Sequence, residues 1–135
     1  MKKITLSIAI IVALYACTSK PVLQNTDNKP TTSIKFEKDI FDFGQITVGD
    51  KVKHSFKFKN TGKIPLIITN ASASCGCTLP NWPKTPVKPN QSATIDVVFN
   101  SAGKKGLQDK IITILANTQP EITKLHLIGE ILEKK

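Results

Sequence analysis

From about residue 33 to residue 133, apolar and polar positions alternate along the chain in short runs. In residues 51–59, a valine and two phenylalanines share one side with His54, while lysines occupy most of the other side. Residues 93–99 and 125–131 repeat this period of two. A period of two is typical of strands that bury one face. The pattern therefore predicts an all-β domain.

Two further segments, residues 64–69 and 110–115, are apolar on both sides, as expected for central strands of a sandwich. Gly129 interrupts its run and predicts a bulge or a close approach of two backbones. Short stretches rich in glycine, proline, asparagine and aspartate separate the runs. We therefore expect about seven strands in a two-sheet antiparallel β-sandwich, with a closed barrel as the alternative.

The first 16 residues have the features of a secretory signal: a basic start, an apolar run and a small residue at the end. The apolar run is shorter than the roughly 20 residues that span a bilayer, so cleavage is expected. Leu14-Tyr15-Ala16-Cys17 resembles the lipobox of bacterial lipoproteins. The resemblance implies cleavage before Cys17 and lipid on its thiol and amine. An ordinary signal peptide with a chance cysteine is the alternative.

The chain then divides into three parts: a signal peptide at 1–16, a lipidated flexible tether at 17–32, and a β-sandwich domain at 33–133. The tether is polar and interrupted by prolines, with too few apolar residues to offset the entropy lost on folding. The remaining hundred or so residues suit one domain with one core. Thr18 stands where many inner-membrane lipoproteins have an aspartate, which favours the outer membrane, facing the periplasm.

All the basic residues are lysines, and the formal net charge of +9 becomes +7 when Lys2 and Lys3 leave with the signal. A basic domain attracts polyanions through its field. Arginine, the residue best suited to phosphates and guanine edges, is absent, and export separates the protein from nucleic acid, so no nucleic-acid partner is expected. The lysines of residues 51–59 alternate along a strand, which is typical of a solvated face; a functional basic patch is the alternative.

Several short motifs together resemble one bacterial domain family. They are Phe41-Asp42-Phe43-Gly44-Gln45-Ile46 followed by Gly49, Phe56-Lys57-Phe58-Lys59-Asn60-Thr61-Gly62, Pro65-Leu66-Ile67-Ile68 and Ser74-Cys75-Gly76-Cys77-Thr78. The combination, over about residues 34–131, is similar to the domain of unknown function numbered 1573. The resemblance implies an immunoglobulin-like sandwich akin to domains of Hydin and abnormal-spindle proteins, in a lipoprotein form typical of Bacteroidetes. It implies no activity, and it makes Asn60-Thr61-Gly62 and Asp42-Phe43-Gly44 fold-setting turns.

Cys75 and Cys77 are the only thiols left once Cys17 carries lipid, and the expected compartment oxidises thiols. Gly76 between them allows the tight backbone that an i, i+2 disulfide needs. A loop of three residues gives only about 1.6 kcal/mol of stabilisation by chain entropy, so such a bond is a weak staple. A structural bond, a redox-active bond and a metal-related pair all remain open.

Two cysteines with His54 and His126 form a nominal Cys2His2 set that would suit zinc. His54 is in phase with the inward residues of its strand, whereas His126 is out of phase with Leu125 and Leu127. We therefore do not expect the two histidines to converge, and we predict no metal and no cofactor. The sequence has no nucleophile elbow and no paired carboxylates near an aromatic cleft, so we predict that the protein is not an enzyme.

Trp82 is the only tryptophan and lies among prolines just after the cysteine motif. It either presents a rigid apolar surface to an envelope protein or glycan, or caps the open end of the core. The sequence thus favours a lipid-anchored, noncatalytic binding or scaffolding module that makes contact through residues 74–84. The alternative is a periplasmic thiol-disulfide or metal-handling protein that uses Cys75-Gly76-Cys77.

Overall fold

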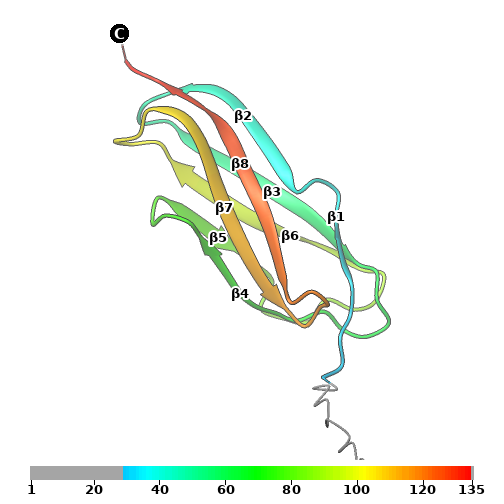
Figure 1. The fold of residues 1–135 in the computed structure, drawn as a ribbon. Coiled ribbons are helices and arrows are strands. Elements are labelled where there is room, and N and C mark those ends of the chain that lie inside the picture. The colour runs from blue at the N-terminus through cyan, green and yellow to red at the C-terminus, as the bar shows by residue number, and fades with distance from the viewer. Residues whose placement is uncertain (1–28, 135) are drawn as a thin grey trace, which may run out of the picture.

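The computed structural model describes residues 29–134, which form two four-stranded sheets packed face to face (Figure 1). The first sheet has the order β1-β3-β6-β5 and the second the order β2-β8-β7-β4. The strands are β1 (Ile34–Phe36), β2 (Ile40–Thr47), β3 (Lys51–Asn60), β4 (Ile68–Ala73), β5 (Thr78–Asn81), β6 (Ser92–Asn100), β7 (Gly106–Ala116) and β8 (Ile122–Leu132). The expected all-β sandwich is confirmed, and the closed barrel is not observed.

Strand β3 shows how the sequence pattern produces the fold. Val52, Phe56 and Phe58 are buried, while the lysines between them are exposed. Successive side chains on a strand point to opposite faces, so the period of two places every apolar residue of β3 against the second sheet. The alternation in β6 and β8 works in the same way, and Ile95, Leu125 and Leu127 are fully buried.

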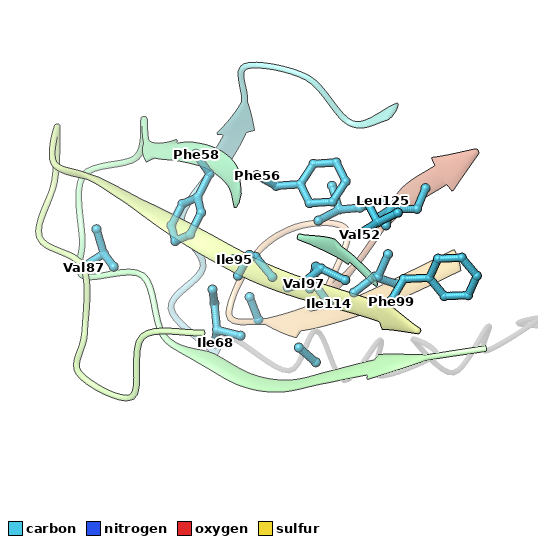
Figure 2. Close-up of a cluster of buried hydrophobic side chains, with 14 of the residues drawn as sticks. Val52, Phe56, Phe58, Ile68, Val87, Ile95, Val97, Phe99, Ile114 and Leu125 are labelled. Carbon is cyan, nitrogen blue, oxygen red and sulfur yellow. The ribbon is translucent and has the colours of Figure 1, made fainter. Parts of the chain in front are cut away.

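The core fills the space between the two sheets. Figure 2 shows aromatic and aliphatic side chains gathered between the strands that carry them. The largest fully buried apolar residues are Phe56, Phe58, Phe99, Leu66, Ile95, Ile112, Ile114, Leu125, Leu127 and Val97. Burial of a side chain of this size stabilises the fold by about 1.5–3 kcal/mol. Every residue of this core lies between positions 52 and 131, so a chain that starts at residue 18 keeps it entire.

The segment at 64–69 differs from the prediction. It was expected to be one central strand, but β4 begins only at Ile68 and lies at the edge of its sheet. Pro65 has no N–H to donate to a ladder. The side chain of Asn117 instead donates to the Pro65 carbonyl at 3.0 Å and accepts from Ile67 N at 2.7 Å. The prediction for 110–115 is confirmed, because β7 lies between β8 and β4.

The strand count and one pairing also depart from the expectation of about seven antiparallel strands. The additional short strand is β5, which contains Pro80 and forms an edge, where a missing N–H is tolerated. Strands β2 and β8 run parallel, with a register shift between Asp42 and Gln45. Gly129 lies opposite this shift: a Cβ there would collide with the Phe43 ring and come within 2.6 Å of the Gly44 carbonyl oxygen. The predicted close approach at Gly129 is therefore confirmed.

Thr32 belongs to the folded domain, although the sequence analysis assigns it to the tether. It is 5% exposed, and its hydroxyl donates to the Asn60 side chain at 2.9 Å. In residues 29–134, no helix is long and apolar enough to cross a membrane.

Candidate functional site

The Cys75–Cys77 loop joins the edges of the two sheets. Strand β4 ends at Ala73 and β5 begins at Thr78, so the chain changes sheet within this loop. A disulfide links Cys75 and Cys77, whose Cα atoms lie 5.3 Å apart, within the ordinary range for such a bond. Both cysteines are half-buried, and Cys77 packs against the core.

Backbone hydrogen bonds tie this loop to both sheets. Ser74 N donates to the Ile111 carbonyl at 2.9 Å, and Ile111 N donates to the Ser74 hydroxyl at 3.2 Å. On the other side, Asn100 N donates to the Cys77 carbonyl at 2.9 Å. Thr78 is buried, and its hydroxyl lies 3.6 Å from the sulfur of Cys75. The disulfide therefore sits in a loop whose two ends are fixed.

A hollow of about 260 Å³ opens beside the disulfide, on the outer face of the β1-β3-β6-β5 sheet. It is lined by Lys51, Gly76, Cys77, Leu79, Val98, Asn100, Ala102 and Lys104. Leu79 is paired with Val98 across β5 and β6, and its side chain is 67% exposed. The hollow thus combines an apolar wall with two lysines, a set that suits a ligand bearing both apolar and anionic groups.

The sequence pattern does not mark Leu79 or Lys104 as site residues, and it includes Lys51 only in the alternative of a basic patch on residues 51–59. They come from β5, the start of β3 and the turn after β6, and only the pairing of these strands brings them together. One signal was available: Leu79 follows the cysteine motif in an alternating Thr-Leu-Pro-Asn run, which indicates a short strand with Leu79 on one face.

Trp82 follows β5 directly and packs, half-buried, against the core. The ammonium of Lys84 lies over its ring, 2.9 Å from the ring centroid. One part of the indole therefore contacts the interior while a lysine covers another, an arrangement typical of a cation–π pair. Trp82 therefore packs on the core, and its role in partner contact stays a prediction.

The two histidines occupy different environments. His54 lies between the sheets, stacked on the Phe41 ring with centroids 3.7 Å apart, and the ring of Phe56 meets it edge-on at 4.6 Å. Burial, and secondarily the positive charge of Lys38, lowers the pKa of His54 below its usual 6.5. His126 is on the outer face of β8, with Nδ1 2.9 Å from an Asp109 carboxylate oxygen. They do not converge, as the strand phases predicted.

Three other predictions concern a metal site, two turn motifs and the lipidated cysteine. In the described part of the chain, no three or more His, Cys, Asp or Glu side chains gather in a way that would bind a metal ion. Asn60 is fully buried, and its side chain accepts from Gly62 N at 3.0 Å. The expected turn at Asp42-Phe43-Gly44 lies instead inside β2, at its register shift, where the Asp42 carboxylate accepts from Gly44 N at 2.8 Å. Cys17 lies outside the described residues, so its lipidation stays a prediction.

Comparison with solved structures places the fold among immunoglobulin-like, PapD-like sandwiches. Domain 7 of human CEP192, an ASH/PapD-like domain, is similar with a TM-score of 0.63 and 10% identity, and the match covers 99% of this chain and 100% of that one. A protein of unknown function from Porphyromonas gingivalis W83 is similar with a TM-score of 0.66 and 18% identity, over 76% of this chain and 48% of that chain. This chain therefore spans about half the length of the Porphyromonas protein.

A chaperone, CupB2 of Pseudomonas aeruginosa, is similar with a TM-score of 0.54 and 14% identity, over 72% of this chain and 55% of that one. At these identities the likeness shows the fold alone. No curated protein matches the sequence. The family model described as "Protein of unknown function (DUF1573)" matches residues 34–131. That match covers well over half of the chain and agrees with the motifs noted in the sequence, and the protein belongs to the DUF1573 family.

Proposed function

We propose that this protein is a lipid-anchored, noncatalytic binding module of the cell envelope. The DUF1573 match and the sandwich fold identify a β domain of unknown function, and the anchor and the binding role are the proposal. The anchor is supported by the apolar run that ends at Cys17 and by its likeness to a lipobox. Stable anchorage would take at least two signals, because one acyl chain binds a membrane only marginally.

The observation that carries the binding role is the hollow beside the disulfide. Most sequence motifs of this domain serve packing and turns. The hollow, in contrast, brings exposed Leu79 together with Lys51 and Lys104 from separate elements. A hollow with an apolar wall and two cations offers a partner both apolar and charged contacts, as binding sites do. Within residues 74–84, we therefore propose Leu79 as the first contact residue, and we keep Trp82, which packs on the core, as the second.

The anchor is tested by mass spectrometry of the protein from the membrane fraction. We expect a mature chain that begins at Cys17 and carries a diacylglyceryl group and an amide-linked acyl chain. A Cys17→Ala variant should keep its signal or be released in soluble form. An unmodified Cys17 in the wild-type protein would contradict the anchor.

The contact surface is tested with a photo-reactive amino acid placed at position 79 in intact cells, with position 122 as the matched control. Leu79 and Ile122 are both exposed aliphatic residues, at 67% and 52%, but they lie on opposite outer faces of the sandwich. We expect position 79 to capture an envelope component and position 122 to capture less of it. Equal capture at both positions would show that the hollow is not a specific contact site.

A second candidate, a thiol-disulfide exchange protein, is favoured by the position of Cys77 in the wall of the hollow. A thiolate of a dithiol partner would attack one sulfur and form a mixed disulfide. The partner's second thiolate would then displace that sulfur, so that the partner is oxidised by two electrons and Cys75 and Cys77 leave as thiols. The test is the reduction potential of the purified chain from residue 18 onward. A potential below roughly −300 mV would mark the bond as structural and reject this candidate.

A further inference from the structure

Five lysines cover the outer face of the β1-β3-β6-β5 sheet. They are Lys35 on β1 and Lys51, Lys53, Lys57 and Lys59 on β3, and all five are exposed. We call this set the lysine face. Glu37 and Asp96 are the acids on the same surface, and the Asp96 carboxylate accepts a hydrogen bond from the Ser55 hydroxyl at 2.6 Å. Cations therefore outnumber acids on this face.

No lysine of this set takes part in an ion pair with another residue of the 29–134 region; the ion pairs there are Lys105–Glu133 and His126–Asp109. Lys35 stands directly opposite Lys59 across the β1–β3 pair. Like charges in directly opposed positions of an antiparallel pair are destabilising. Folding alone therefore does not account for this arrangement of charge.

The charges are close enough to act together. Lys51 and Lys53, and likewise Lys57 and Lys59, are two residues apart on β3, which corresponds to about 6.7 Å along a strand. The Debye length at physiological ionic strength is about 8 Å, so neighbouring ammonium groups reinforce one field before salt screens it. The lysines extend along the full length of β3, about 27 Å from Lys51 to Lys59.

The two ends of the lysine face have different neighbours. At one end Lys53 is in register with Val98, and Val98 with exposed Leu79, so a cation and two apolar side chains form one row across the sheet. At the other end lies Thr32, bonded to the side chain of Asn60, where the chain leaves the domain toward Cys17. An exposed apolar residue next to cations is the pattern of a surface that binds a lipid interface.

We infer that the lysine face docks the domain on an anionic phospholipid surface, with Leu79 entering the boundary between headgroups and acyl chains. This rests on the proposed function and names its partner: the contacted envelope component is the membrane itself, in place of a protein or glycan. Lysine fits this role because an ammonium is a point charge that suits a diffuse field, whereas arginine suits directed, bidentate phosphate contacts. Juxtamembrane lysines are attracted to anionic lipid in the same way.

The test is binding of the unlipidated chain from residue 18 onward to vesicles at about 0.15 M salt, with about one third phosphatidylglycerol in phosphatidylcholine, or with phosphatidylcholine alone. We expect binding to the anionic vesicles only. Each lysine near such a surface contributes about 1 kcal/mol, equivalent to roughly fivefold in partition coefficient. Lys53→Gln/Lys57→Gln should therefore reduce the partition coefficient by roughly 25-fold.

The matched control is Lys124→Gln/Lys134→Gln, which removes the same charge from the opposite sheet and from the chain beyond it. We expect this control to lose less than about fivefold. Equal losses in the two double variants would mean that net charge alone drives binding and would overturn the inference. So would equal binding to neutral vesicles, or tighter binding to polygalacturonate than to vesicles of equal anionic charge.

The outcome is independent of the anchor, because the tested chain carries no lipid. Failure of vesicle binding with a lipidated Cys17 in cells would remove the membrane as the partner and leave the proposed function intact. An unmodified Cys17 in cells, together with vesicle binding that depends on the lysine face, would contradict the lipid anchor and keep the membrane as the partner. Far-UV circular dichroism of both double variants checks that each remains folded.

Discussion

The Asn60–Gly62 turn and the Cys75–Cys77 loop are both short, glycine-containing motifs, but their surroundings differ. Asn60 is fully buried, and its side chain takes part in four hydrogen bonds, with Thr32, Gly62, Ile64 and Val87. Cys75 and Cys77 are half-buried, and a Cβ at Gly76 between them would meet no atom within 4 Å.

The difference separates residues that specify the fold from residues free to contact something else. A buried amide with all its partners satisfied cannot change without leaving polar groups unpaired. The cysteine loop is fixed only at its ends, so its middle can vary or bind. For this reason we place the contact surface at the hollow next to the cysteine loop, and assign the Asn60–Gly62 turn to stability.

The largest expected effect is that of Asn60→Ala. The substitution removes all four hydrogen bonds of the Asn60 side chain and leaves the Gly62 N–H without its partner. The Ile64 carbonyl keeps a bond from the Thr32 hydroxyl, and the Val87 carbonyl keeps one from Leu66 N. Each lost hydrogen bond costs about 0.5–1.5 kcal/mol and the unpaired N–H of Gly62 about 1–3 kcal/mol, so we expect a loss of about 3 kcal/mol or more in the free energy of unfolding. Urea denaturation followed by circular dichroism measures it. A loss below about 1 kcal/mol would show that water replaces these bonds and that the turn is not fold-setting.

A matched pair of glycine substitutions sharpens the comparison. A Cβ at Gly62 would collide with the Thr32 hydroxyl and approach Ser33 N to 2.6 Å, whereas at Gly76 it would meet open space. We expect Gly62→Ala to lower the free energy of unfolding by about 1–3 kcal/mol, as overpacking does. Gly76→Ala should change it by no more than about 0.5 kcal/mol. Similar losses in the two variants would erase the distinction between the two motifs.

Some of this distinction could be read from the sequence. The period of two in β3, β6 and β8 placed most buried apolar residues correctly, because successive side chains of a regular strand point to opposite faces. The segment at 64–69 was misassigned because its apolar run resembles a strand, while the interactions that interrupt it come from Asn117, about fifty residues away. A single sequence contains no direct sign of such a contact.

The hollow could not be predicted from the sequence for a similar reason. Leu79, Val98 and Lys51 line one hollow only through the registers of β5 with β6 and β6 with β3. The cysteine motif indicated the right part of the chain, and the alternating lysines indicated an exposed face. Their adjacency depends on strand order, which the alternation of residues does not specify.

The disulfide is expected to have a smaller effect than Asn60→Ala. The loop closed between Cys75 and Cys77 contains three residues, for which chain entropy gives about 1.6 kcal/mol at most. Cys75→Ser/Cys77→Ser should therefore unfold at slightly lower urea, with a loss of about 1.6 kcal/mol or less. Unfolding under non-reducing conditions provides the comparison. A loss above about 3 kcal/mol would make this loop as important for stability as the Asn60–Gly62 turn.

Lowering the pH should not change the stabilising contribution of either the Asn60–Gly62 turn or the Cys75–Cys77 loop. The Asn60–Gly62 turn contains no titratable side chain, and disulfide-bonded cysteines do not titrate. The group expected to respond is His54, whose pKa in the folded protein is lowered by burial and then by Lys38. Below about pH 6.5 the unfolded chain binds a proton at His54 more readily than the folded one does, so stability is complete above that pH. The free energy of unfolding decreases as the pH falls from about 6.5 through the lowered pKa of His54.

We therefore expect the urea midpoint of the wild-type chain to decrease between about pH 7 and pH 5, and His54→Gln to show a smaller decrease. Gly76→Ala and the double cysteine variant should keep the wild-type dependence on pH, because His54 stacks on Phe41 between the sheets and contacts neither loop. An unchanged slope in His54→Gln would assign the acid sensitivity to carboxylates. A changed slope in the loop variants would show that the cysteine loop is coupled to the interior, contrary to the freedom inferred from the space around Gly76.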